Sequence, residues 1–589
     1  MPRITVHPSG APDGAAGARA AGSHAPGSQA AGSDAAGARA AGSDAPSFAL
    51  EATPGRSLLA ALAVSSRVFL AAACGGRGSC GKCRVQVQEA VGGAAPVSTA
   101  DRRFLSAEEL RSGVRLGCTL PADAVRRIAL LTTSDAAFTK AEMPHIPGPV
   151  DPIVRCDGPD GATCYGVAVD IGTTTLGCYL IDLEPAQGVA TDASGRVVAA
   201  RSATNRQAVF GADVLSRISH ADRGGLEELR SAIVAELNEL LPALAERRAA
   251  ARGGGAGAEA TQDAAGPASI AAVAVTGNTT MLHLLLGVDP HGIGRAPFTP
   301  VFTESRQLRG AELGLVGQPE AEVHVLPSIS AYVGADVVAA MVAEDLDRTA
   351  DSVLMIDVGT NGELVLAHEG RLHACSTAAG PAFEGATITH GVGGVAGAIA
   401  SWRREGDDLV FETIAGAPPV GICGSGLLDV VAGLLDDGVV DETGRMMDAA
   451  GASTPPGEAA FTLAPGIAVT QGDIREVQLA KAAIAAGIEV LLDRAGLQAA
   501  DLDEVVLTGG FGHHLSAASA LRIGLLPEVE VGRIRSTPNA AGAGAVRALL
   551  QREVLPRMRR VAERTEYIEL SGRPEFQDRY VDNMIFPAS

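Results

Sequence analysis

Four cysteines near the start of the chain have the spacing of ligands for an iron-sulfur cluster. Cys74, Cys80 and Cys83 form the pattern C-x5-C-x2-C, and Cys118 follows after 34 further residues. A plant-type 2Fe-2S cluster takes three thiolates from one loop and one from a distant position, and its first gap usually holds four residues rather than five. The spacing therefore predicts a 2Fe-2S cluster and one-electron chemistry in a loop that is one residue longer than usual.

Glycines surround these cysteines. Gly75, Gly76, Gly78 and Gly81 would let the backbone curl around the cluster with its N–H groups directed at sulfur. The alternative is a zinc site, although structural zinc usually takes paired C-x2-C or His ligands and the fourth cysteine here stands alone. We expect the other cysteines to be packed thiols; they are Cys156, Cys164, Cys178, Cys375 and Cys423.

Two segments have the residue types of a phosphate-binding turn. One apolar run leads into Asp170-Ile171-Gly172-Thr173-Thr174-Thr175, and another leads into Asp357-Val358-Gly359-Thr360-Asn361-Gly362-Glu363. Such a turn offers backbone N–H groups and hydroxyls to phosphate oxygens, while its aspartate can hold hydrated Mg²⁺. A single copy could be a plain hairpin turn, but the recurrence favours a site for ATP and Mg²⁺.

A third glycine-rich segment follows another apolar run. It reads Thr508-Gly509-Gly510-Phe511-Gly512, where missing side chains could admit an adenosine. The first half of the chain has a similar run that ends in Thr276-Gly277-Asn278. This internal duplication predicts two similar α/β lobes with ATP between them. The turns 278–280 and 424–426 are also expected near the nucleotide, with no role assigned.

Two further features beside these turns could take part in chemistry. Glu363 lies just beyond the second phosphate turn and is a candidate for orienting the attacking water, the alternative being a solvated strand residue. His513 and His514 could suggest a metal site, but adjacent side chains point apart, so surface or packing roles are favoured.

These motifs require at least two domains. Residues 1–133 predict an α+β, ferredoxin-like (β-grasp) domain, in which strands at 4–8 and 48–52 flank a low-complexity insertion at about 9–46 and a helix covers 58–64. Prolines fragment residues 134–164, which we expect to be a linker. Residues 165–589 are expected to form the two-lobed α/β domain.

Composition limits the classes of partner. The 589 residues include 68 acidic and 47 basic side chains, a net charge of -21 that argues against nucleic acid. No apolar run is long enough to be a signal core or membrane span. We expect a cytoplasmic protein in a reducing compartment, with no membrane partner.

The nucleotide motifs resemble those of the superfamily of acetate and sugar kinases, heat-shock chaperones and actin. The resemblance covers residues 166–549 and makes Asp170 to Thr175 similar to its first phosphate loop, Asp357 to Glu363 to its second, and Thr508 to Gly512 to its adenosine motif. It implies an actin-like ATPase domain.

The combination of a 2Fe-2S domain with this ATPase resembles the reductive activators of corrinoid-dependent methyltransferase systems. Strings that carry the resemblance include Val333-Gly334-Ala335-Asp336, Gly380-Pro381-Ala382-Phe383-Glu384-Gly385 and Gly421-Ile422-Cys423-Gly424-Ser425-Gly426. It implies an anaerobic, ATP-hydrolysing enzyme that returns a corrinoid protein from inactive Co(II) to active Co(I), for example in O-demethylation.

The resemblance also implies partners. They are the corrinoid protein of a methyltransferase system and an upstream low-potential reductant. The linker is too short for the small extra domain of some relatives, so a homodimer stays an open expectation. Two rival hypotheses remain: a small-molecule kinase, which would not need a cluster, and an electron carrier that nucleotide merely regulates.

Overall fold

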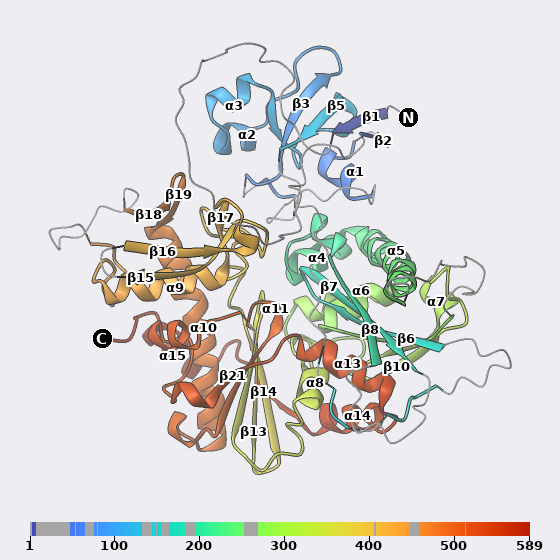
Figure 1. Ribbon diagram of the computed structural model, residues 1–589, viewed down its shortest axis with the longest axis vertical. Helices are drawn as coiled ribbons and strands as arrows, with labels where there is room; N and C mark the ends of the chain where they lie inside the picture. The colour runs from blue at the N-terminus through green and yellow to red at the C-terminus, as the bar shows by residue number, and fades with distance from the viewer. Residues whose placement is uncertain are drawn as a thin grey trace, which may run out of the picture. The chain divides into compact units, whose positions relative to one another are not determined.

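The computed structural model describes most of the chain. The described residues are 3–7, 47–52, 55–64, 76–78, 81–131, 144, 146–148, 150–154, 164–183, 196–252, 269–405, 408–447, 459–512 and 514–588. The chain divides into two compact units, with the boundary after Asp135 (Figure 1). We call them the N-terminal unit and the C-terminal unit.

In its described residues, the N-terminal unit is a five-stranded sheet with three short α-helices. Its strand order is β2-β1-β5-β3-β4, in the β-grasp arrangement. The strands are β1 (Arg3–His7), β2 (Phe48–Glu51), β3 (Arg84–Ala90), β4 (Val114–Leu116) and β5 (Val125–Leu130), and the helices are α1 (Leu58–Val64), α2 (Thr99–Phe104) and α3 (Ala107–Arg111).

The predicted hairpin around the low-complexity insertion is present. β1 pairs antiparallel with β2, Val6 lying opposite Phe48, so the pairing reaches both edges of the insertion, whose residues 8–46 lie outside the described part. The strands alternate buried and exposed side chains, and Ile4, Val6 and Leu50 enter one hydrophobic core together with α1.

The C-terminal unit contains two six-stranded sheets. The first has the order β10-β11-β9-β6-β7-β8, and the second has the order β21-β20-β12-β13-β14-β22. The strands of the first are β6 (Cys164–Ile171), β7 (Thr175–Asp182), β8 (Val197–Thr204), β9 (Ser269–Gly277), β10 (Arg306–Arg309) and β11 (Glu322–Val325). Those of the second are β12 (Val353–Val358), β13 (Gly362–His368), β14 (Arg371–Thr377), β20 (Glu504–Thr508), β21 (Ile534–Ser536) and β22 (Glu566–Tyr567).

The predicted duplication is confirmed by strand register. In the first sheet Asp170 on β6 lies opposite Gly177 of antiparallel β7 and Thr276 of parallel β9. In the second, Asp357 on β12 lies opposite Glu363 of antiparallel β13 and Thr508 of parallel β20. Each aspartate therefore occupies the same place in its sheet, beside a hairpin turn and opposite a threonine of a parallel strand.

Helices and small sheets complete this unit (Figure 1). The helices are α4 (Val214–His220), α5 (Leu226–Arg252), α6 (Thr279–Leu286), α7 (Gly310–Leu313), α8 (Ala335–Ala343), α9 (Gly424–Asp436), α10 (Gln471–Ala495), α11 (Gly509–Gly512), α12 (Ala517–Arg522), α13 (Ala540–Leu550), α14 (Val554–Arg564) and α15 (Pro574–Asp582). The small sheets comprise β15 (Ala398–Glu405), β16 (Asp408–Thr413) and β17 (Gly421–Ile422), and β18 (Ala460–Ala464) with β19 (Ile467–Thr470).

Helices α8 and α13 pack with their backbones unusually close. A Cβ added to Gly544 would lie 2.1 Å from the carbonyl oxygen of Ala339, so only glycine fits at this crossing. The buried Arg547 then donates to the carbonyl oxygens of Val342 and Ala343 at the end of α8, at 2.7 and 3.0 Å. These contacts fix α8, whose first turn carries Asp336.

The structure differs from the sequence prediction in three places. Part of the expected linker packs against the C-terminal unit: Ile146 is buried in its core, and the Asp151 amide donates to Leu550 O at 2.8 Å. The glycine segment 509–512 is one turn of helix rather than an open turn. Cys164 is disulfide-bonded rather than a packed thiol, while Cys178, Cys375 and Cys423 are buried free thiols as expected.

Within the described ranges, none of the helices has the length and apolar character needed to cross a membrane.

Candidate cluster and nucleotide sites

Two of the four predicted cluster ligands lie next to each other. Cys83 directly precedes β3 and Cys118 follows β4, and these strands pair with Arg84 opposite Leu116. The amide of Gly117 donates to the carbonyl oxygen of Cys83 at 2.7 Å. Cys83 is buried and Cys118 is partly exposed. Cys74 and Cys80 lie outside the described residues.

The loop around Cys83 has a backbone that favours glycine. Gly76, Gly78 and Gly81 have φ values of 78°, 70° and 68°, in the left-handed region. A Cβ on Gly81 would also come within 2.8 Å of the Phe104 side chain on α2. The tight loop and the adjacent thiols fit the donor set of a 2Fe-2S cluster, which needs cysteine sulfurs from a loop and from one distant strand end.

Arg84 fastens this loop to the two neighbouring helices. Its Nε donates to Gly81 O at 3.1 Å, and its Nη2 donates to Phe104 O, at the end of α2, also at 3.1 Å. Its Nη1 forms an ion pair with Glu109 on α3. The Arg84 side chain thus links Gly81, in the cluster loop, to α2 and α3.

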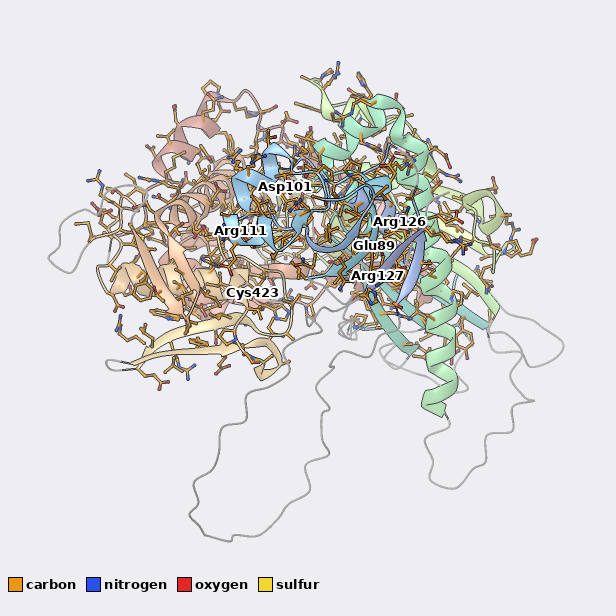
Figure 2. All side chains as sticks on the ribbon, turned by 90° about the horizontal axis from the view of Figure 1, so that it is seen from above. Glu89, Asp101, Arg111, Arg126, Arg127 and Cys423 are labelled. Carbon is orange, nitrogen blue, oxygen red and sulfur yellow. The ribbon has the colours of Figure 1, made fainter. Side chains whose placement is uncertain are left out.

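Asp101 on α2 secures the other side. Asp101 is labelled in Figure 2. Its buried carboxylate accepts from the backbone amides of Ser98 at 2.7 Å and of Leu116 at 2.8 Å, and Leu116 lies two residues before Cys118. Because a buried carboxylate without partners would be costly, these bonds make Asp101 a fixed link between α2 and β4.

The first phosphate turn joins β6 to β7. The Gly172 amide donates to Thr175 O at 3.0 Å, and a Cβ on Gly172 would lie 2.6 Å from that oxygen. The side-chain Nδ2 of Asn278 donates to Thr173 Oγ1 at 3.0 Å, and the buried Arg217 guanidinium donates to Thr173 O at 2.5 Å. Asn278, predicted to be near the nucleotide, therefore holds a hydroxyl of this turn.

The second phosphate turn joins β12 to β13 in the same manner. The Gly359 amide donates to Asn361 O at 2.9 Å. Thr360 Oγ1 donates to Glu384 Oε1 at 2.8 Å, and Thr174 Oγ1 of the first turn donates to Oε2 of the same carboxylate at 3.1 Å. The two predicted turns are thus brought together at one side chain.

Three aspartates near these turns repel one another electrostatically. Burial is the main reason why the pKa of Asp170 is raised to about 7, and the Asp336 carboxylate adds to the shift. The pKa of Asp357 is raised to about 7 by burial and by repulsion from Asp336 and Asp170. Burial raises the pKa of Asp336 itself to about 6. A divalent cation would relieve this repulsion, which suits Mg²⁺.

No direct metal cage accompanies these aspartates. Among the residues that the structure describes, no three His, Cys, Asp or Glu side chains are arranged to hold a metal ion. A Mg²⁺ ion at Asp170 and Asp357 would therefore keep most of its waters and rely on phosphate oxygens, as Mg²⁺ commonly does.

Glu363 lies beside this acidic group and is not simply solvated. Burial, followed by repulsion from Asp357 and Asp336, raises its pKa well above the usual range, against hydrogen bonds from Asn361 and Ser376. Ser376 Oγ donates to Glu363 Oε1 at 3.3 Å. A carboxyl with a raised pKa next to the second phosphate turn is suited to hold a proton or a water.

The predicted adenosine segment is coupled to the second aspartate. Gly509 has φ 92°, and a Cβ there would lie 2.2 Å from Asp357 Oδ1. Among the described residues, no atom lies within 4 Å of a Cβ position on Gly510. His513 lies outside the described residues.

The turn at residues 424–426 has a packing role. Ser425 Oγ donates to Ala400 O at 2.8 Å, and a Cβ on Gly426 would lie 2.3 Å from Ile399 O. These contacts seat the start of α9 on β15.

Sequence reasoning assigned no role to four side chains of the site: Asp336, Glu384, Arg217 and Asn539. The first two stood in strings quoted for the family resemblance. Asn539 donates to Tyr179 Oη at 3.0 Å and hydrogen-bonds to Asp170. Asp336 could have been found from the sequence, because it is an acidic residue directly after Gly334-Ala335 at the start of a helix. Arg217 has no comparable sequence signal.

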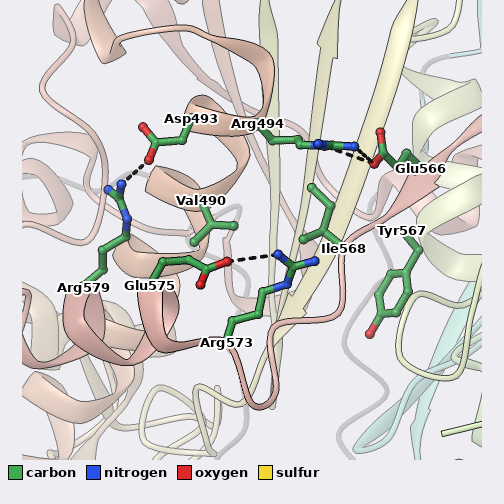
Figure 3. Close-up of a pocket in the computed structure, with 9 residues that line it drawn as sticks. All are labelled: Val490, Asp493, Arg494, Glu566, Tyr567, Ile568, Arg573, Glu575 and Arg579. Atoms are coloured by element: carbon green, nitrogen blue, oxygen red, sulfur yellow. Dashed lines mark hydrogen bonds and ion pairs between the residues drawn. The ribbon is translucent and has the colours of Figure 1, made fainter. Parts of the chain in front are cut away.

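A pocket of about 420 Å³ lies elsewhere on the C-terminal unit, between α10, β22 and α15 (Figure 3). Its arginines are engaged in ion pairs: Arg494 with Glu566 at 2.5 Å, and Arg573 with Glu575 at 3.0 Å. These pairs neutralise the lining, so the pocket does not compete with the phosphate turns as an anion site.

Family models match three parts of the chain. Residues 43–123 match the 2Fe-2S iron-sulfur cluster binding domain. Residues 165–349 match the RACo middle region, and residues 351–589 match the C-terminal domain of RACo, the ASKHA domain.

Whole-chain comparisons agree with these matches. The corrinoid activation enzyme RamQ of Eubacterium limosum is 33% identical over 442 residues, covering 72% of this chain and 70% of its own. The Co(II) methylated amine-specific corrinoid protein reductase of Methanosarcina barkeri is 25% identical over 394 residues, covering 62% and 66%. A solved reductive activator for corrinoid, iron-sulfur protein is 28% identical with a TM-score of 0.63, covering 92% of this chain and 98% of its own. This chain therefore belongs to the family of reductive activators of corrinoid proteins.

Proposed function

We propose that this protein uses ATP to drive one electron from a 2Fe-2S cluster onto the cobalt of a corrinoid protein, converting inactive Co(II) to active Co(I). The observation that carries the proposal is the placement of Cys83 and Cys118 at adjacent strand ends, in a chain that also joins two phosphate turns at Glu384. Residues 1–133 would be the electron-transfer domain and residues 165–589 the ATPase domain, and the family matches support this division.

In the N-terminal unit, Cys74, Cys80, Cys83 and Cys118 would hold the cluster, which supplies one electron at a time. Arg84 and Asp101 fix the loop and the distant strand end relative to each other. A rigid ligand set keeps the reorganisation on electron transfer small, because little of the surrounding backbone has to move.

In the C-terminal unit, the phosphate turns would bind the nucleotide. Backbone amides and hydroxyls of Gly172 to Thr175 and of Gly359 to Asn361 would face phosphate oxygens, and Gly509 to Gly512 would face the adenosine. Asp170 and Asp357 would hold hydrated Mg²⁺. The nearby Asp336 carboxylate repels both of them, and a cation would offset this repulsion. Glu363 would orient the attacking water.

An energy source is needed because the transfer is uphill. Plant-type clusters have potentials of roughly -400 mV. Each further 100 mV that the cobalt requires costs about 2.3 kcal/mol for one electron. A nucleotide that binds two states of the protein with different affinity can offset this cost.

The rate of ATP hydrolysis tests the proposal against its rivals. Hydrolysis by the cluster-loaded protein should rise severalfold when the Co(II) corrinoid protein is added, and should not rise with acetate or hexoses. Phosphoryl transfer to acetate or a sugar would instead identify a small-molecule kinase. ATP binding without stimulated hydrolysis would identify a nucleotide-regulated electron carrier.

A further inference from the structure

Glu384 lies in a loop after β14 whose shape is tightly fixed. Its amide donates to Pro381 O at 3.2 Å, and Phe383 before it is buried in the core of the second sheet. Gly385 after it has φ 74°, and a Cβ there would lie 2.8 Å from the amide nitrogen of Val392. The backbone therefore holds the Glu384 side chain in one place.

The two oxygens of this carboxylate are divided between the two phosphate turns. Oε1 accepts the Thr360 hydroxyl at 2.8 Å, and Oε2 accepts the Thr174 hydroxyl at 3.1 Å. Thr360 belongs to the second sheet and Thr174 to the first. Glu384 thus joins the two turns through hydroxyls that sequence analysis assigned to phosphate.

A hydroxyl has only one proton to donate. The phosphate oxygens of a nucleotide are acceptors, so they need the same two protons that Glu384 accepts. A phosphate that accepts a hydrogen bond from either threonine must therefore replace Glu384 as the acceptor. The negatively charged phosphate then lies close to the Glu384 carboxylate.

Arg217 on α4 supplies the positive charge of this neighbourhood. Its buried guanidinium donates to Thr173 O at 2.5 Å and to Gly211 O at 2.9 Å, and its charge acts on Glu384. The carbonyl of Thr173 is one residue before the Thr174 hydroxyl. Arg217 therefore binds the first turn through a backbone carbonyl, and Glu384 binds it through a side-chain hydroxyl.

We infer that Glu384 is a positioning residue that couples the two phosphate turns by competing with the terminal phosphate of the nucleotide for the hydroxyl protons of Thr174 and Thr360. The inference rests on the proposed nucleotide site and adds to it a means of distinguishing ATP from ADP. When the terminal phosphate takes both protons, the link through Glu384 is released; without that phosphate, Glu384 keeps the turns joined.

Calorimetric titration of Mg-ATP and Mg-ADP into the full-length protein tests this inference. Glu384→Gln removes the negative charge and leaves one acceptor oxygen, so the affinity for Mg-ATP should rise about tenfold, the equivalent of about 1.4 kcal/mol. The affinity for Mg-ADP should change by less than about twofold, and the kcat for ATP hydrolysis should fall as coupling is lost. Glu369→Gln, the same change at an exposed position in the turn between β13 and β14, should alter neither affinity.

A double-mutant cycle with Thr360→Val separates competition from a structural role. If Glu384 acts through the hydroxyl, Glu384→Gln should have a smaller effect on Mg-ATP affinity in the Thr360→Val background than in the parent. Thr360→Ser keeps the hydroxyl and should retain the parent's affinity for Mg-ATP. If Glu384→Gln does not fold, comparison of these two threonine variants for ATP against ADP selectivity still decides the question.

Three outcomes would overturn the inference: equal changes in ATP and ADP affinity, weaker ATP binding by Glu384→Gln, or strict additivity in the cycle. If the parent protein binds no Mg-ATP, the proposed nucleotide site itself fails. The two failures are therefore distinguishable.

Discussion

Gly509 and Asp357 are in such close contact that a methyl group on the glycine would lie 2.2 Å from Asp357 Oδ1. Asp357 in the second phosphate turn can thus keep its position only if residue 509 of the predicted adenosine segment has no side chain. The contact follows from register, because Asp357 on β12 lies opposite Thr508 of parallel β20.

Gly509→Ala should consequently disturb both folding and nucleotide binding. The left-handed φ of 92° and the clash with Asp357 should lower the free energy of unfolding by about 1 to 3 kcal/mol and weaken Mg-ATP binding at least about tenfold. Chemical denaturation and calorimetric titration measure the two effects. Gly510→Ala is the control, since no atom of the residues that the structure describes lies within 4 Å of its Cβ position, and its stability should match the parent. Equal stability of both variants would refute the steric argument.

The aspartate cluster should make stability depend on pH. A carboxyl whose pKa is raised on folding favours the protonated, folded form, so stability is lost as pH rises from the unfolded pKa toward the folded one. With Asp170 and Asp357 at about 7 and Asp336 at about 6, the melting temperature without divalent ions should fall between about pH 4 and about pH 7. Added Mg-ATP should raise it most above pH 7, where the carboxylates are charged.

Asp336→Asn should flatten that pH dependence. It removes the neighbour that raises the pKa of both other aspartates, while an amide oxygen can still accept from the Val337 amide. Melting curves at several pH values measure the slope. An unchanged slope would mean that Asp336 is not coupled to the other two aspartates.

Cys118→Ser should abolish the 2Fe-2S cluster. It removes the one distant thiolate, so the visible absorbance, the EPR signal of the reduced cluster and the bound iron should all be lost. Cys423→Ser is the matched control: Cys423 stands at the N-cap of α9 in the C-terminal unit, where serine is favoured, and this variant should keep its cluster (Figure 2). A cluster retained in Cys118→Ser would exclude the proposed ligand set, and tightly bound zinc in its place would support the alternative.

Arg84→Ala should destabilise the cluster loop without removing a ligand. It deletes the bonds to Gly81 O and Phe104 O and leaves Glu109 without its ion pair, so the N-terminal unit should lose about 1.5 to 3 kcal/mol of unfolding free energy. Loss of cluster absorbance in air should accelerate severalfold. Arg126→Ala, at an exposed position on β5, should leave both quantities unchanged (Figure 2). Identical decay of the two variants would deny Arg84 this role.

Much of the architecture was predictable because it depends on local patterns. The cysteine spacing, the repeated Asp-x-Gly-Thr segments and the apolar runs before them predicted the β-grasp unit, the duplicated sheets and the turns. The strand registers of Asp170 and Asp357 confirm the duplication.

Other parts of the site depend on long-range packing and left little signal. Glu384 reaches Thr174 across 210 residues, and Arg217 reaches Thr173 from a helix that sequence analysis did not single out. The packing of Ile146 in the expected linker likewise depends on tertiary contacts rather than on local pattern.

The central claim is that ATP drives an uphill electron transfer to corrinoid cobalt. Anaerobic absorption spectroscopy of the cluster-loaded protein with a Co(II) corrinoid protein and a low-potential reductant tests it most directly. The proposal predicts that the Co(II) band is lost and the Co(I) band appears upon addition of Mg-ATP, and that Cys118→Ser shows neither change. Equally fast formation of Co(I) with and without Mg-ATP would contradict the claim.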